Sequence, residues 1–144
     1  MRKLFLILSL ASLSLHVGAA DNTQTCNQKA HTQLDINSCA GSELSAADKE
    51  LNLVYQAILK KHKDNKKFLS SLKTAQQAWL LWRDAELKAI YPEGNDAKEY
   101  GSTITACWPQ QVAALTRDRT KQLRKWIDGV EEGDVCAGSV PFKE

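Results

Sequence analysis

The stretch Ala75-Gln-Gln-Ala-Trp-Leu-Leu-Trp-Arg-Asp84 decides the fold of this 144-residue chain. It has no glycine, proline or β-branched residue, so it predicts a helix. The residues that recur at helical spacing on one face are Leu69, Leu72, Gln76, Trp79, Arg83 and Ile90. Gln76 and Arg83 therefore share the face that Trp79 would bury. Because an unpaired buried guanidinium costs several kcal/mol, we expect Arg83 to have partners on other helices and Arg83→Ala to lower stability strongly.

Helical patterns also dominate the rest of the chain, and no Val/Ile/Thr-rich alternation is long enough to predict a strand. The expected helices span about 24–36, then up to about Lys63, then about 66–90, and finally from a cap at Ser102 or Thr103 to Gly129. In the second of these an apolar seam recurs at steps of three and four: Leu44, Ala47, Leu51, Val54 and Ile58. We predict an all-α fold, an antiparallel bundle of three main helices plus a short N-terminal helix. The short connection at 63–66 should make the second and third helices neighbours.

The N-terminus has the pattern of a secretory signal peptide over residues 1–20. Arg2 and Lys3 precede an apolar run, Leu4 to Leu15, that is too short to span a bilayer, and small residues follow it up to Ala20. An uncleaved membrane anchor is the alternative. We therefore expect a mature chain of residues 21–144, forming one domain with an irregular tail at 130–144. It should be exported to the periplasm or the extracellular space, with no membrane attachment after signal removal.

The charge of the mature chain argues against a nucleic-acid partner. The full chain has 19 Lys and Arg and 17 Asp and Glu, and the signal peptide carries two of the basic residues and none of the acids. Removing it leaves 17 of each sign and a formal net charge of zero. The basic isoelectric point of the precursor is therefore no sign of nucleic-acid binding.

All four cysteines, Cys26, Cys39, Cys107 and Cys136, lie in the expected mature chain. An even number of cysteines in an exported protein predicts two disulfides, with free buried cysteines as the alternative. Their spacing includes no Cys-x-x-Cys motif and no His pair, so we expect no zinc site. No other metal or cofactor site is expected.

Polar residues on three predicted helices fall where helix packing could bring them together. They are Asp48, Asn52 and Tyr55 on the second helix, Gln76 and Arg83 on the third, and Thr116 and Arg119 on the fourth. One interpretation is a polar binding site between helices. The other, which we favour, is a structural network of hydrogen bonds and ion pairs that fixes the register of the bundle.

No set of residues predicts catalysis. His31 and His62 lack a nearby nucleophile, and Asp84 and Glu86 point about 200° apart on a helix, unlike a glycosidase carboxyl pair. The four tryptophans could stack on sugars, although such residues more often belong to a core: Trp79, Trp82, Trp108 and Trp126. We therefore predict a binding protein and no enzyme.

Three ordered blocks carry a family resemblance. The blocks are Asn37-Ser-Cys39-Ala with Ala47-Asp-Lys-Glu-Leu-Asn-Leu-Val-Tyr55, then Ala75 to Glu86, then Gly101-Ser102 with Cys107 and Leu115-Thr-Arg-Asp-Arg119. Together they resemble the LprI-like lysozyme inhibitor family of small exported helical domains, over about residues 26–125. The resemblance implies an inhibitor of lysozyme-type muramidases that occludes the substrate cleft, and hence a protein partner. The alternative is a cell-envelope interaction or structural domain that binds another protein or a small ligand without inhibiting lysozyme.

The cysteines depart from the family pattern at one position. The family usually has a cysteine just after the Arg-Asp-Ala-Glu stretch, where this chain has Leu87, and Cys136 is an addition. If Cys136 replaces the missing partner, the resemblance implies the pairs Cys39–Cys107 and Cys26–Cys136. The second pair would tie the tail to the N-terminal helix.

A cleft inhibitor needs a protruding segment, and the loop from Tyr91 to Ser102 is the best candidate. It offers hydrogen-bond donors in Tyr91, Lys98, Tyr100 and Ser102, and acids in Glu93, Asp96 and Glu99 that suit a basic enzyme. The alternative is a solvated connector between two helices.

Overall fold

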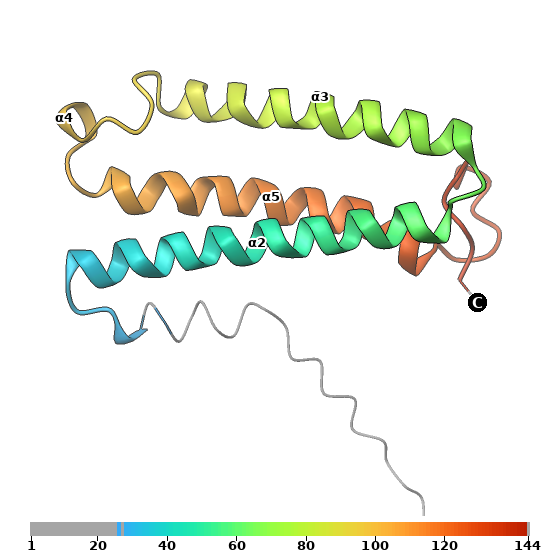
Figure 1. Cartoon of the computed structure of the whole chain (residues 1–144), viewed down its shortest axis with the longest axis horizontal. Coiled ribbons are helices and arrows are strands. Elements are labelled where there is room, and N and C mark those ends of the chain that lie inside the picture. The colour runs from blue at the N-terminus through green and yellow to red at the C-terminus, as the bar shows by residue number, and fades with distance from the viewer. Residues whose placement is uncertain (1–25, 27, 144) are drawn as a thin grey trace, which may run out of the picture.

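The computed structural model describes residues 26 and 28–143, and this part of the chain is all-helical, as predicted (Figure 1). Its helices are α2 (Gln33–Lys61), α3 (Lys66–Ile90), the single turn α4 (Ala97–Tyr100) and α5 (Ile104–Asp128). None of them combines the length and the apolar character needed to cross a membrane. The expected signal peptide lies outside the described residues.

Helix α2 begins earlier than expected, at a capping box. The Thr32 side chain accepts a hydrogen bond from the Asp35 amide at 3.1 Å, and the Asp35 carboxylate accepts one from the Thr32 amide at 3.0 Å. Hydrogen bonds to the Asp35 carboxylate, from the Thr32 side chain first and then from the His31 and Thr32 amides, lower the pKa of Asp35 from its usual value of 3.8. The break between the N-terminal helical residues and the long helix therefore lies at 30–32 and not near 36.

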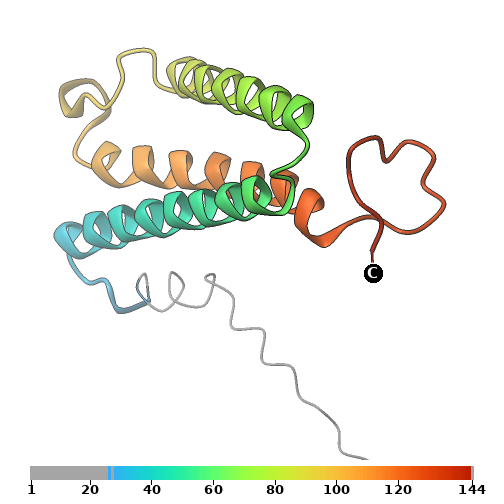
Figure 2. The same cartoon turned by 45° about the vertical axis from the view of Figure 1, so that its right-hand side comes forward.

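Helices α2 and α5 run in the same direction and lie side by side, and α3 runs along them in the opposite direction (Figures 1 and 2). The closest packing is between α2 and α5. Their buried residues include many small ones, which allow two helices to approach closely: Ala40, Ala47, Ala106, Ala113, Thr116 and Thr120. The residues that α3 buries are large, namely Phe68, Leu72, Trp79 and Leu87, so α3 is held at a greater distance. The two helices that pack most closely are therefore α2 and α5. They are not α2 and α3, the consecutive helices that the short turn at 63–66 joins.

Polar contacts fix the register of the parallel pair. Glu43 pairs with Arg117, and seven residues further along each helix the Glu50 carboxylate accepts a hydrogen bond from Arg124 at 2.7 Å. At the C-terminal ends, Lys61 Nζ donates to the Ile127 carbonyl at 2.8 Å and His62 Nε2 donates to the Trp126 carbonyl at 3.0 Å. These two donors satisfy carbonyls that the last turn of α5 leaves free.

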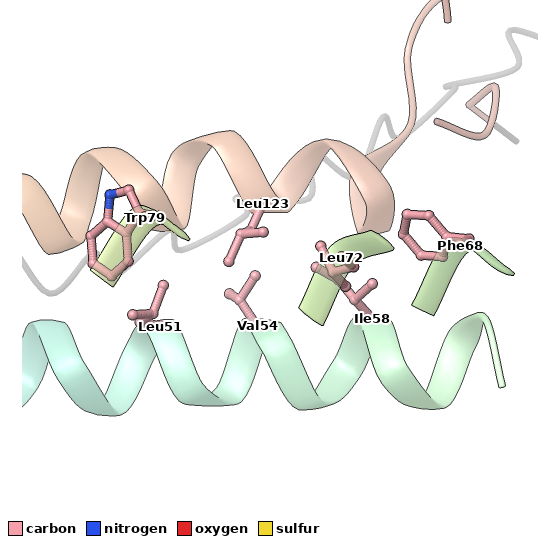
Figure 3. Close-up of a cluster of buried hydrophobic side chains, with 7 residues drawn as sticks. All are labelled: Leu51, Val54, Ile58, Phe68, Leu72, Trp79 and Leu123. Atoms are coloured by element: carbon pink, nitrogen blue, oxygen red, sulfur yellow. The ribbon is translucent and has the colours of Figure 1, made fainter. Parts of the chain in front are cut away.

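The core lies where α3 covers the groove between α2 and α5 (Figure 3). Its members are Leu51, Val54 and Ile58 from α2, Phe68, Leu72 and Trp79 from α3, and Leu123 from α5. The predicted seam of the second helix is thus buried from Ala47 to Ile58.

The cysteine pairing differs from the expectation. Cys26 is bonded to Cys39, with Cα atoms 5.7 Å apart, while Cys107 and Cys136 are free and exposed. The pairs Cys39–Cys107 and Cys26–Cys136 are therefore wrong. Cys107 lies near the start of α5 and Cys136 in the tail beyond its end, so the two thiols are held at opposite ends of the bundle (Figure 1).

The described tail after α5, residues 129–143, contains no helix, and noncovalent contacts hold it. Gly129 ends α5 with a φ of +77°, and a parallel bridge joins Val130 to Phe142. The Trp126 indole N–H donates to the Ser139 hydroxyl at 3.1 Å.

Candidate functional site

The loop between α3 and α5, residues 91–102, lies at the end of the bundle opposite the tail and carries α4 at its tip (Figure 1). The Asp96 carboxylate caps α4 by accepting a hydrogen bond from the Lys98 amide at 2.8 Å. Gly94 and Gly101 turn the chain on either side of α4 with φ values of +70° and +75°, which favour glycine. The Asp96 cap and the two glycine turns therefore define the backbone conformation of this loop.

An aromatic cluster holds the base of the loop. The ring of Tyr91 contacts that of Tyr100 edge to face at 5.5 Å between centroids, and that of Trp108 at 5.7 Å. The Tyr100 hydroxyl also accepts a hydrogen bond from the Glu93 amide at 3.2 Å. Sequence reasoning missed Trp108, because nothing in its spacing indicates that the first turns of α5 reach back to the loop.

The four predicted loop residues thus separate into two pairs. Tyr91 and Tyr100 are half-buried and hold the loop, although the Tyr100 hydroxyl keeps a proton that it can donate. Lys98 and Ser102 are exposed. The loop therefore exposes the Lys98 ammonium and the Ser102 hydroxyl, while the two tyrosines hold its conformation.

A second feature is a polar groove of about 380 Å³ between α2 and α3. Five of the seven residues predicted as a network line it: Asp48, Asn52, Tyr55, Gln76 and Arg83. Within the described part of the chain, no hydrogen bond links the α2 members to the α3 members. The structure brings these residues together around an open groove, and a closed network between α2 and α3 is not formed.

Arg83 finds its partner on its own helix. Its Nε and Nη2 atoms donate to the Asp84 carboxylate at 3.1 and 2.9 Å, and its guanidinium lies over the Trp79 ring at 5.4 Å. The expected partners on other helices are absent among the described residues. Among these polar residues, it is Arg119 of α5 that forms a hydrogen bond to another helix. Its Nε donates to the side-chain oxygen of Gln76 on α3 at 3.0 Å. Thr116 is fully buried, and its hydroxyl oxygen has no partner in the described structure.

A third feature is a groove of about 360 Å³ on the other side of α3, against α5. It is lined by Trp79, Trp82, Leu115, Asp118, Arg119 and Gln122. Burial lowers the pKa of Arg119, which still carries its charge because a guanidinium does not deprotonate in proteins. The described residues hold no group of three or more potential metal ligands.

Comparison with known proteins assigns the chain to a family. The model of the family described as lysozyme inhibitor LprI matches residues 25–123. The chain belongs to the LprI family. The match includes the loop 91–102 and both grooves along α3, and it ends before the tail.

A relative of this chain in Rhizobium meliloti (strain 1021), an uncharacterized protein, is 30% identical over 115 residues. The similarity covers 72% of this chain and 80% of the relative. No solved structure matches the chain.

Proposed function

We propose that this LprI protein is an exported inhibitor of lysozyme-type muramidases that inserts the loop 91–102 into the substrate cleft. The observation that carries the proposal is the architecture of this loop. It projects from one end of the bundle, its base is held by the Tyr91–Tyr100–Trp108 cluster, and it leaves Lys98 in α4 and Ser102 after α4 exposed. A loop that is ordered before binding loses less conformational entropy on binding.

The chemistry of the tip suits the target. A lysozyme cleft holds two carboxyl groups, one of them ionised. The Lys98 ammonium supplies a counter-charge, and the hydroxyls of Ser102 and Tyr100 supply further donors. The acids of the same loop, Glu93, Asp96 and Glu99, face the cationic surface that surrounds such a cleft in a basic enzyme.

The Cys26–Cys39 disulfide supports the exported location, because disulfides persist in oxidising compartments. Binding without turnover agrees with the family to which the chain belongs.

The proposal is tested by titrating the purified, oxidised protein into a muramidase assay with cell-wall substrate and c-, g- and i-type lysozymes. We expect stoichiometric inhibition of at least one type. Lys98→Ala should raise the inhibition constant about thirtyfold or more, since loss of one partner of a desolvated charge pair costs about 2–5 kcal/mol. Lys63→Ala is the matched control, an exposed lysine in the turn at the other end of the bundle.

Two results would contradict the proposal in different ways. If no lysozyme type is inhibited, the protein is no muramidase inhibitor. If inhibition persists unchanged in Lys98→Ala, Ser102→Ala and Tyr100→Phe, the inhibitory surface lies elsewhere on the molecule. Tyr100→Phe keeps the ring that packs on Tyr91 and removes only the hydroxyl, so it separates the donor from the scaffold.

A further inference from the structure

The groove between α3 and α5 contains a cation without an anionic partner. Arg119 donates from Nε to Gln76 and from Nη1 to the Gln122 side-chain oxygen at 3.1 Å, and both acceptors are neutral amides. Within the described residues no carboxylate lies within ion-pair distance of this guanidinium, whereas the neighbouring Arg117 and Arg124 are both paired with acids of α2. In the described part of the chain Arg119 therefore has no anionic partner, while the one carboxylate that lines the same groove, that of Asp118, pairs with Lys121.

Aromatic surface lies beside this charge. Trp82 is 50% exposed although it is a large apolar side chain, and it lines the groove together with the buried Trp79. A half-exposed indole next to a polar wall offers a flat face on which the C–H groups of a pyranose ring can pack. The volume of about 360 Å³ is at the low end of small-molecule sites, which suits one or two sugar rings.

The other polar side chains of the groove, Asp118 and Gln122, can form hydrogen bonds with the hydroxyls of a sugar. Asp118 points one carboxylate oxygen at Lys121, 3.2 Å away, and is otherwise exposed, so it can accept hydrogen bonds from sugar hydroxyls. The Gln122 side chain uses its oxygen on Arg119 and keeps its two N–H donors. A purely aromatic carboxylate would leave these groups without partners.

From this juxtaposition we propose that the α3–α5 groove binds a carboxylate-bearing saccharide, with the sugar ring packed on Trp82 and the carboxylate paired with Arg119. The site lies along the middle of the bundle, apart from the loop 91–102. The proposal does not depend on lysozyme inhibition, and the two can fail separately.

The test is an NMR titration of the ¹⁵N-labelled protein with D-glucuronate, followed at the indole N–H of Trp82 and the Nε–H of Arg119. D-glucose is the neutral matched probe and benzoate is the aromatic carboxylate. We expect saturable shifts with glucuronate at millimolar concentration, and binding of glucose and of benzoate at least about tenfold weaker, because each lacks one of the two recognised groups.

Single substitutions test the two proposed contacts, that of the sugar ring with Trp82 and that of the carboxylate with Arg119. Trp82→Ala should weaken glucuronate binding about tenfold, whereas Leu81→Ala, at the adjacent and 75% exposed position outside the groove, should leave it unchanged. Arg119→Gln should abolish the preference for glucuronate over glucose, and Arg124→Gln on another face of α5 should keep it. The fold of each variant is checked by its dispersed amide spectrum, and if Arg119→Gln does not fold, the comparison of glucuronate with glucose in the unmodified protein still tests the preference for a carboxylate.

The proposal is overturned if glucuronate produces no saturable shift, if glucose or benzoate binds as tightly as glucuronate, or if Leu81→Ala weakens binding as much as Trp82→Ala. Lysozyme inhibition should be the same in Trp82→Ala as in the unmodified protein, because Trp82 lies outside the loop 91–102.

Discussion

At the scale of single residues, Thr116 has the buried side-chain oxygen that lacks a hydrogen-bond partner in the described structure. Thr116→Val keeps the shape of the side chain and removes the unsatisfied hydroxyl. We expect the free energy of unfolding to rise by about 1 kcal/mol, and the melting temperature by about 2–6 °C, because burying an unpaired hydroxyl is costly.

Thr120→Val is the matched control for this change. The Thr120 hydroxyl is buried one turn later and donates to the Thr116 carbonyl at 2.9 Å, so its removal loses a hydrogen bond. Thermal unfolding should rank Thr116→Val above the unmodified protein and Thr120→Val below it. The reverse order would show that Thr116 has a partner, such as a buried water.

The partners of polar side chains were predictable from the sequence only where they are neighbours along the chain. The sequence places Gln76 and Arg83 on the helix face that contains Trp79, and in the structure both side chains are partly buried. Their partners depended on the distance between helices: Arg83 turned to Asp84 next to it, while Arg119 reached across to Gln76. The strong loss of stability expected from Arg83→Ala is therefore reduced to that of a same-helix pair and a cation–π contact, about 1 kcal/mol in total.

At the scale of the elements, two glycines predict opposite effects of the same substitution. Gly41 lies inside α2 with open space around the position of a Cβ atom, so Gly41→Ala should stabilise the protein by about 0.5–1 kcal/mol. At Gly129 the φ is +77° and a Cβ would lie 2.9 Å from the Lys143 amide nitrogen, so Gly129→Ala should displace the tail.

The displacement can be followed by the NMR signal of the Trp126 indole N–H, which donates to Ser139 in the tail. Gly133→Ala is the control, since Gly133 also has a positive φ, +95°, but has open space around it. If the two variants perturb the Trp126 signal equally, backbone strain and not the close approach of the tail is responsible.

The N-terminus of α2 predicts a pH dependence. Hydrogen bonds favour the charged form of Asp35, so its pKa is lower in the folded protein than the usual 3.8. Its contribution to stability is therefore present above that value and is lost as the pH falls through the lower folded pKa. Comparing thermal unfolding from about pH 7 to about pH 2, we expect the advantage of the unmodified protein over Asp35→Asn to shrink in the acid range. A difference that stays constant across this range would contradict the capping role.

Element boundaries were predictable where turn chemistry is local. The turn at 63–66, the end of α3 before Pro92 and the end of α5 at Gly129 follow from the residues at those positions. The start of α2 was not predicted, since the expected boundary between the first two helices lay near residue 36. In the structure α2 begins after Thr32, which forms a capping box with Asp35.

At the scale of the whole molecule, the cysteines give a direct test of the fold. A non-reducing digest of the oxidised protein should yield a peptide containing the Cys26–Cys39 bond, and a thiol reagent should modify Cys107 and Cys136 in the native state. The disulfide closes a short loop, so removing it by Cys26→Ser should cost no more than about 3 kcal/mol. A peptide that links Cys107 or Cys136 to another cysteine would contradict the arrangement.

The number and the type of the main helices were predictable from sequence periodicity, but their packing order was not. Periodicity shows which face of a helix is apolar, and the apolar faces of three helices can associate in more than one way. Side-chain size decided the outcome, because the small residues of α2 and α5 let these two helices meet while the large ones on α3 keep it farther away. Sequence alone could not distinguish the half-buried tyrosines of the loop 91–102 from its exposed residues Lys98 and Ser102, because it does not show that Trp108 packs against Tyr91.

The pairing of the first and last main helices has a consequence for how the chain folds. The contacts that align α2 with α5 join residues 64–74 positions apart, so the helices that pack most closely must meet across nearly the whole domain. Such non-local closure slows folding relative to a bundle whose tightest contacts join consecutive helices. A growing chain also cannot complete this interface until α5, its last helix, has been synthesised, and until then α2 and α3 expose the apolar faces that α5 will cover.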